Sequence, residues 1–184
     1  MSKLLKYENA KLKNQFIFNL PVSKAICGRQ CPGCYALKAQ IRFPTTVLPS
    51  RQRLHAASLQ SDFVTTIVNE LTSTRRTART VRIHESGEFY SQDYIAKWQQ
   101  IATALPTFTF YAFTKRMKDF DFSQLMSLPN VVIIDSLMHG GLNYAPLANL
   151  DPTRFICPAT SCGVNCRYCM TKTAQLQGIQ FIKH

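Results

Sequence analysis

The chain has 184 residues, of which 46% are apolar, and this is enough for one domain with a hydrophobic core. It carries 22 Lys and Arg against 10 Asp and Glu, a formal net charge of +12. Apolar runs such as Val131 to Ile134 are far shorter than the ~20 residues of a membrane-spanning helix, and the charged start MSKLLKYENAKLK lacks the apolar stretch of a signal peptide. We therefore expect a cytoplasmic protein that does not contact membranes and that has affinity for polyanions.

The apolar pattern along the chain predicts strands that alternate with helices. Runs rich in aromatic and β-branched residues predict strands, and apolar residues at helical spacing predict helices, two of them capped by Ser61 and Ser91. The predicted strands cover residues 14–22, 80–90, 107–115 and 130–138, and the predicted helices cover residues 61–73, 91–105 and 121–128.

Strands that alternate with helices indicate βαβ units and a parallel sheet. Four units are too few to close an eight-stranded barrel. We therefore expect an α/β fold with an open or partial (β/α) barrel-like parallel sheet over residues 1–150. A cysteine-rich C-terminal extension is expected to follow over residues 151–184.

Seven cysteines form two groups near the two ends of the chain. The first group lies directly after the first predicted strand with the spacing C-x3-C-x2-C, and the second repeats that spacing with one more cysteine five residues upstream. Thiols stay reduced in the cytoplasm, so such groups indicate metal ligands or redox centres rather than disulfides. The first group is Cys27, Cys31 and Cys34, and the second is Cys157, Cys162, Cys166 and Cys169.

Zinc and iron–sulfur clusters are the two candidate metal centres. Structural zinc sites usually show two C-x2-C pairs, whereas three close thiolates can hold three corners of a cubane cluster and four can complete a 4Fe-4S site. The chain can therefore hold two 4Fe-4S clusters, or one cluster that the two groups share. Structural zinc remains the alternative.

The first cysteine group resembles the signature of the radical S-adenosylmethionine superfamily, which places C-x3-C-x2-C after the first strand of a βα chain. The stretch ESGEFY, with Gly87 and Glu88, is similar to the Gly-Gly-Glu-Pro stretch that receives the amino group of the cofactor. Tyr35 directly follows the third cysteine, and Gly33 stands where the superfamily usually has an aromatic residue beside the adenine. The four-cysteine tail resembles the auxiliary-cluster extensions of some members. The resemblance implies a 4Fe-4S cluster with an open iron, S-adenosylmethionine as cofactor, and radical chemistry.

Most of the chain also resembles a family of small phage-encoded cysteine-rich proteins of the same type. The runs RIHESGEFYS, FYAFTK, CYA and IQFIKH carry this resemblance. It implies a viral protein that acts in the cytoplasm of the host cell.

Several residues at the ends of predicted strands are candidates for lining the site. His84 and Glu85 lie near the end of the second predicted strand and Lys115 ends the third, where α/β proteins place functional groups. His84 is explained equally well as a structural residue.

The positive charge predicts nucleic acid as a partner, and the redox chemistry predicts an electron donor. The residues expected to contact nucleic acid are Arg75, Arg76 and Arg79 together with Lys3, Lys6, Lys11 and Lys13. The expected function is redox or radical chemistry by a 4Fe-4S protein. The alternatives are an electron-transfer protein and a metal-stabilised nucleic-acid-binding module.

Overall fold

The computed structural model describes residues 3–29, 31, 33–136, 144–145, 151, 153–158 and 162–182. Its centre is a five-stranded sheet in the order β1-β2-β3-β4-β5. The first strand is antiparallel to the second, and the remaining pairs are parallel. The strands are β1 (Lys6–Tyr7), β2 (Phe16–Phe18), β3 (Thr80–Ile83), β4 (Thr109–Thr114) and β5 (Val131–Asp135). Within the described residues the sheet does not close, so the predicted α/β fold with an open sheet is confirmed. The sheet is mostly rather than wholly parallel, because the antiparallel strand β1 was not predicted.

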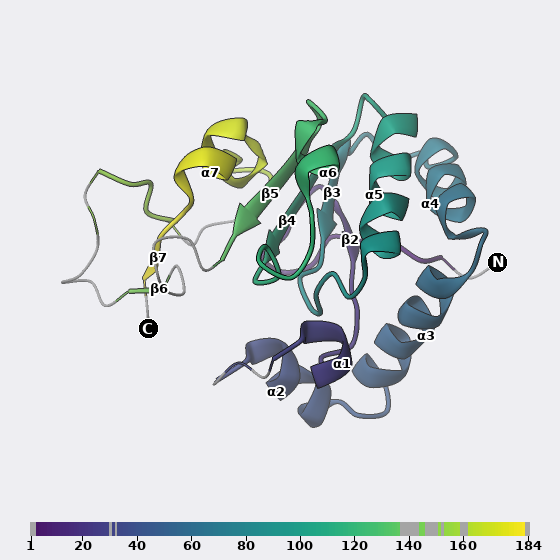
Figure 1. Ribbon diagram of the computed structural model, residues 1–184. Coiled ribbons are helices and arrows are strands. Elements are labelled where there is room, and N and C mark those ends of the chain that lie inside the picture. The colour runs from purple at the N-terminus through teal and green to yellow at the C-terminus, as the bar shows by residue number, and fades with distance from the viewer. Residues whose placement is uncertain are drawn as a thin grey trace.

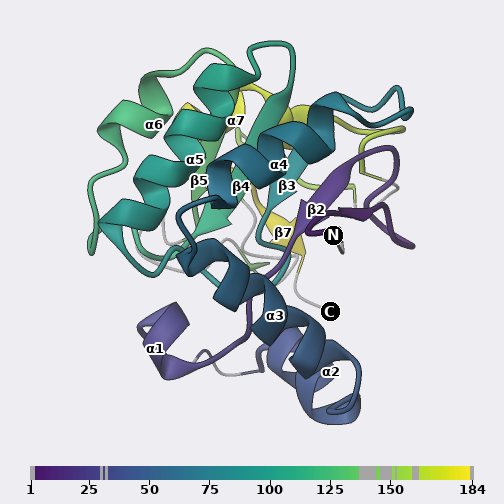
Figure 2. The same cartoon turned by 90° about the vertical axis from the view of Figure 1, so that its right-hand side faces the viewer.

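Three helices cover one face of the sheet (Figures 1 and 2): α4 (Phe63–Thr72), α5 (Gln92–Ala104) and α6 (Ser123–Ser127). The Ser91 side chain caps α5 by accepting a hydrogen bond from Tyr94 N, as the sequence predicted. The N-cap of α4 is Asp62 instead of the predicted Ser61. No helix among the described residues is both long enough and apolar enough to cross a bilayer.

The main core lies between these helices and the sheet. Trp98 on α5 is completely buried, and its ring packs edge-on against Phe18 of β2 and Phe63 of α4, with ring centroids 5.5 and 5.9 Å away. Ile83 and Phe110 of the sheet are also fully buried in this core. Since burying one such side chain stabilises a fold by about 1.5–3 kcal/mol, this layer holds the sheet rigid beneath the site.

The cysteine-rich C-terminal segment packs on the opposite face of the sheet. Its helices are η3 (Tyr168–Met170) and α7 (Lys172–Gln177), and Figure 1 shows α7 beside β5, on the side away from α5. A second core joins Ala174 of α7 to Tyr111 and Val132 of the sheet. Farther along, β7 (Phe181–Ile182) pairs in parallel with β6 (Tyr144–Ala145). The predicted boundary between the α/β domain and the C-terminal extension lies between residues 150 and 151. Residues 146–150 at this boundary lie outside the described part of the chain.

Three further helices stand at the carboxyl ends of the strands, below the sheet in Figure 1: α1 (Lys24–Cys27), α2 (Tyr35–Arg42) and α3 (Val47–Leu59). The Gln40 side chain fixes α2 to the chain after β2, because it accepts from Val22 N (3.0 Å) and donates to Val22 O (3.2 Å). Arg51 of α3 donates to Ala36 O at 2.8 Å. The sequence analysis did not predict α2 and α3, although they position the first cysteine group.

Candidate metal centre

The carboxyl ends of the strands, the helices beyond them and the C-terminal segment enclose a cavity of about 440 Å³. Every residue that the sequence predicted for the site borders this one cavity. The seven cysteines do so, and the other predicted residues along its wall are Tyr35, His84, Glu85, Gly87, Glu88 and Lys115. All seven cysteines are free thiols.

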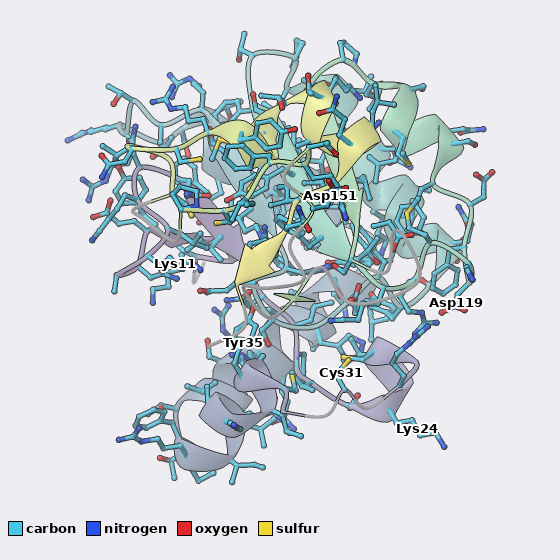
Figure 3. All side chains as sticks on the ribbon, turned by 90° about the vertical axis from the view of Figure 1, so that its left-hand side faces the viewer. Lys11, Lys24, Cys31, Tyr35, Asp119 and Asp151 are labelled. Carbon is cyan, nitrogen blue, oxygen red and sulfur yellow. The ribbon has the colours of Figure 1, made fainter. Side chains whose placement is uncertain are left out.

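The first cysteine group occupies the loop between α1 and α2. Cys27 ends α1, and its backbone N donates to Ser23 O at 2.8 Å. Cys34 is the N-cap of α2, and its Sγ accepts a hydrogen bond from Leu37 N at 3.4 Å. Cys31 lies between them in the sequence and borders the cavity, as does Tyr35 (both labelled in Figure 3). The two helix ends thus present two of the three sulfur atoms to the cavity from fixed backbone positions.

The second cysteine group is tied to the start of the chain. Cys162 N donates to Lys11 O at 3.0 Å, and Cys162 O accepts from Lys13 N at 2.8 Å. Gln15 is completely buried beneath this contact: its Nε2 donates to Cys162 O at 3.1 Å, and its Oε1 accepts from the Tyr111 hydroxyl. Segments almost 150 residues apart therefore form one wall of the cavity.

Burial disfavours free thiolates in both groups. It raises the pKa of Cys27, and the neighbouring charges of Cys34 and Cys31 raise that pKa further. Burial raises the pKa of Cys169 to about 12, with added repulsion from Cys157, Cys162 and Cys166. Ionised thiols within each group therefore raise one another's pKa. A metal centre that replaces the thiol protons removes this repulsion, because it supplies the compensating positive charge.

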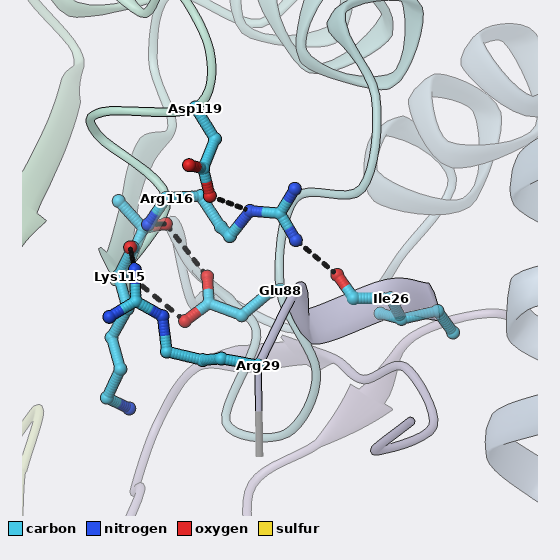
Figure 4. Close-up of polar contacts among 7 residues, drawn as sticks. Ile26, Arg29, Glu88, Lys115, Arg116 and Asp119 are labelled. Atoms are coloured by element: carbon cyan, nitrogen blue, oxygen red, sulfur yellow. Dashed lines mark hydrogen bonds and ion pairs between the residues drawn. The ribbon is translucent and has the colours of Figure 1, made fainter. Parts of the chain in front are cut away.

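Glu88 is a buried carboxylate that borders the cavity. Its Oε2 accepts from Thr114 Oγ1 at 2.8 Å, and its Oε1 accepts from Lys115 N at 3.1 Å (Figure 4). Burial raises the pKa of Glu88, whereas the Thr114 hydrogen bond and the Lys115 charge lower it. Arg116, the next residue, donates to Ile26 O at 3.4 Å and so connects the end of β4 to the cysteine loop (Figure 4).

Glu85, Tyr35 and His84 differ in how they meet the cavity. The Tyr35 hydroxyl donates to Glu85 O, while 60% of the Tyr35 residue stays exposed. The Glu85 carboxylate accepts from Asn9 Nδ2 at 2.8 Å. The His84 ring is buried, with Nε2 2.8 Å from the Tyr94 hydroxyl, and burial lowers the pKa of His84 to about 3. Its packing is that of a neutral structural histidine, although the residue borders the cavity.

Arg82 is a cavity residue that the sequence analysis missed. It lies in the middle of β3, and its guanidinium carbon is 5.0 Å from the ring centre of Tyr111 and 4.4 Å from that of Phe113. Its charge lowers the pKa of Cys169 and of Cys162, opposing the effect of burial. The sequence signal for Arg82 was a basic residue between two aliphatic residues of a predicted strand, Val81 and Ile83. Both of these neighbours are fully buried in the structure. Arg82 is well placed to stabilise negative charge on the second cysteine group.

The predicted nucleic-acid face lies partly away from this cavity. Arg75, Arg76 and Arg79 precede β3 and therefore stand at the amino ends of the strands, opposite the cysteines. The Arg76 guanidinium lies 4.5 Å from the ring centre of Tyr7, and that of Arg79 lies 5.1 Å from that of Phe108. Of the lysines at the start of the chain, Lys11 borders the cavity.

Thiolates are the ligands through which proteins hold iron–sulfur clusters. Seven free thiols in groups of three and four border one cavity, and nearby cations offset part of their charge. Among the described residues, no group of three or more His, Cys, Asp or Glu is arranged to hold a single metal ion. A cubane places its thiolate ligands on separate iron atoms, so these ligands need not converge on one point.

These features define an α/β protein with an open, mostly parallel sheet and a thiol-lined cavity at the carboxyl ends of its strands. The chain belongs to the Gene product 88 family, whose family model matches residues 2–156. That match includes the sheet and the first cysteine group and ends one residue before Cys157. No curated protein and no solved structure matches the chain.

Proposed function

We propose that this protein is a 4Fe-4S iron–sulfur protein whose open sheet forms a partial (β/α) barrel of the radical S-adenosylmethionine type. The observation that carries the proposal is that one cavity collects both cysteine groups together with Gly87 and Glu88. A 4Fe-4S cluster held by three thiolates keeps one iron open and, when reduced, supplies one-electron chemistry. The proposed activity is redox or radical chemistry on a substrate bound in the cavity.

The residues of the first group and their neighbours have distinct tasks in this proposal. Cys27, Cys31 and Cys34 hold the cluster, and Glu88 binds the amino group of S-adenosylmethionine. Each Glu88 oxygen accepts one hydrogen bond, and a carboxylate oxygen has two acceptor positions. An amine can therefore bind without displacing Thr114. The Tyr35 ring, held by its hydroxyl, offers a flat apolar surface to an adenine.

The second group holds a second cluster in this proposal. Its sulfur atoms come from Cys157, Cys162, Cys166 and Cys169, and Arg82 offsets part of the negative charge on that side. A single cluster shared by both groups is the alternative, because all seven thiols border the same cavity.

A second candidate function is a metal-stabilised nucleic-acid-binding or electron-transfer protein without catalysis. The net charge of +12 favours a polyanionic partner, and the zinc form of this candidate would be colourless where an iron–sulfur protein is brown. The leading proposal also requires an electron donor. We further propose that the chain is phage-encoded and acts in the host cytoplasm, which its family name and its resemblance to small phage proteins support.

The test is to reduce the anaerobically reconstituted protein with dithionite and to add S-adenosylmethionine. We expect 5′-deoxyadenosine as a product and a changed electron paramagnetic resonance spectrum on cofactor addition. The Glu88→Gln variant, which keeps the size of the side chain, should keep its iron and bind the cofactor more weakly. If neither product nor spectral change appears while iron and sulfide are fully present, the protein has the cluster without the radical chemistry.

A further inference from the structure

Charge is distributed unevenly along the chain. Residues 9–61 contain no Asp or Glu and eight Lys or Arg, whereas residues 62–136 contain eight of the 10 acidic residues. The acid-free segment forms β2, α1, α2 and α3 and carries the first cysteine group. The part of the protein at the mouth of the cavity is therefore strongly cationic.

Exposed side chains on α2 form a continuous row that begins at the cavity. Tyr35, Lys38 and Arg42 follow the i, i+3, i+7 spacing, so they lie on the same side of the helix. All three are exposed. Tyr35 borders the cavity, and Arg42 is seven residues farther along the helix, at about 1.5 Å per residue. The row thus leads outward from the cavity for about 10 Å.

Aromatic rings accompany these cations. The Tyr35 ring, proposed above to face the adenine of the cofactor, marks the end of the row at the cavity. Phe43, which follows α2, is 48% exposed, and the Arg42 guanidinium lies 5.4 Å from its ring centre. Cationic side chains next to exposed flat rings are how proteins bind single-stranded nucleic acid, since the cations contact phosphates and the rings stack on bases.

We propose that this face of α2 binds single-stranded nucleic acid and leads it to the mouth of the cavity. Lys38, Arg42 and Phe43 combine both chemistries that a single strand needs. The arginines that precede β3 stand at the amino ends of the strands, away from the cavity. The positive charge continues along the cavity wall, where four cationic residues outnumber two acidic ones. The cationic residues are Lys11, Arg29, Arg82 and Lys115, and the acidic ones are Glu85 and Glu88. The proposal names the class of molecule on which the metal centre acts, and in that respect it rests on the proposed function.

The test measures fluorescence anisotropy of a labelled 20-nucleotide single strand, as DNA and as RNA, against a salt series. The Lys38→Glu/Arg42→Glu variant should bind about tenfold more weakly at low salt. Each lost phosphate contact lowers the slope of log K against log salt by about 0.7, so this slope should fall by about 1.4. The Arg75→Glu/Arg76→Glu variant carries the same charge change at the other edge of the sheet and should keep the slope of the unmodified protein.

A third variant, Phe43→Ala, tests stacking. It should weaken binding about tenfold and leave the salt slope unchanged, because it removes a ring and no charge. A duplex of the same length should bind more weakly than the single strand. Three results would each overturn the proposal: no binding of the single strand at low salt, equal slope changes in the two charge-reversal variants, or a preference for duplex.

Iron and sulfide are measured on the same samples, which separates this proposal from the proposed function. Absent oligonucleotide binding in fully iron-loaded protein refutes the nucleic-acid site and leaves the iron–sulfur centre standing. Binding with the predicted slopes in protein that takes up no iron refutes the proposed function and retains the α2 site. Circular dichroism of each variant confirms that it is folded.

Discussion

Gly87 lies where the chain turns after β3, beside the proposed cofactor-binding carboxylate. Its φ is +85°, and a Cβ at this position would stand 2.5 Å from Leu20 Cβ and 3.0 Å from Leu20 O. Leu20 is completely buried, and its backbone N donates to Ser86 O, so it has little freedom to move. A left-handed conformation costs an L-residue about 1 kcal/mol, and overpacking adds about 2 kcal/mol. We therefore expect Gly87→Ala to lower the free energy of unfolding by about 3 kcal/mol.

The matched control is Gly33→Ala, at a glycine with a similar φ of +67° and no atom within 4 Å of the added Cβ. This variant has the conformational cost alone, about 1 kcal/mol. For a chain of this length, thermal unfolding midpoints should fall by about 6–12 °C for Gly87→Ala and by about 2–4 °C for Gly33→Ala. Equal shifts would refute the close packing of Leu20 against Gly87. Iron content measured on both proteins shows whether the loss of stability extends to the metal centre.

Three further predictions concern polar side chains on or beside the sheet. Tyr111→Phe leaves the buried Gln15 Oε1 without its hydrogen bond from Tyr111, so the free energy of unfolding in urea should fall by about 1–3 kcal/mol. An unchanged midpoint would contradict this network. Because burial lowers the pKa of His84 to about 3, the unfolded chain takes up a proton near pH 6.5 that the folded protein excludes. The free energy of unfolding should therefore fall by about 1 kcal/mol from pH 7 to pH 5.5. The control is His84→Asn, because asparagine tolerates the positive φ at this position and does not titrate in this range. Its unfolding midpoint should fall less over the same pH range. Arg82→Gln removes a cation beside the second cysteine group, so it should lower the iron content per chain and increase cleavage of the C-terminal segment by protease. Arg82→Lys keeps the charge and should retain more iron. Equal iron content in the two variants would show that the charge is not needed.

The sequence predicted the parallel sheet well because its strands are sharply patterned. The segments 107–115 and 130–138 contain β4 and β5, although residues 137 and 138 lie outside the described part of the chain. The strand predicted over 80–90 ends at Ile83, because His84 adopts a φ of 60° and turns the chain toward Glu88. Positive φ is uncommon for any residue other than glycine, even though histidine adopts it more often than most, so the strand pattern did not predict this turn.

The two unpredicted helices show where local pattern fails. Only Leu54 and Ser58 are buried on α3, so this helix has no apolar face for periodicity to detect. Its place is set by tertiary contacts instead, among them the hydrogen bond from Arg51 to Ala36 O. The same holds for α2, where Gln40 provides the anchor.

Cysteine spacing singled out residues that lie along one cavity, since all seven cysteines border it. The spacing could not show that the second group packs against Gln15 and the start of the chain, because that contact joins residues 147 positions apart. Arg82 was missed for a related reason. Its role depends on which face of β3 it occupies and on what covers that face, and both follow from the tertiary fold.

The most direct test of the iron–sulfur centre is the iron and acid-labile sulfide content of anaerobically purified protein. Two clusters predict about eight iron and eight sulfide per chain, and one shared cluster predicts about four of each. In the two-cluster case, Cys166→Ser should lower the iron content and expose the C-terminal segment to protease, because metal binding contributes to folding there. Brown protein with about eight iron and eight sulfide is the result we expect. Colourless protein that contains zinc, or protein that binds neither metal after reconstitution, would contradict the iron–sulfur centre.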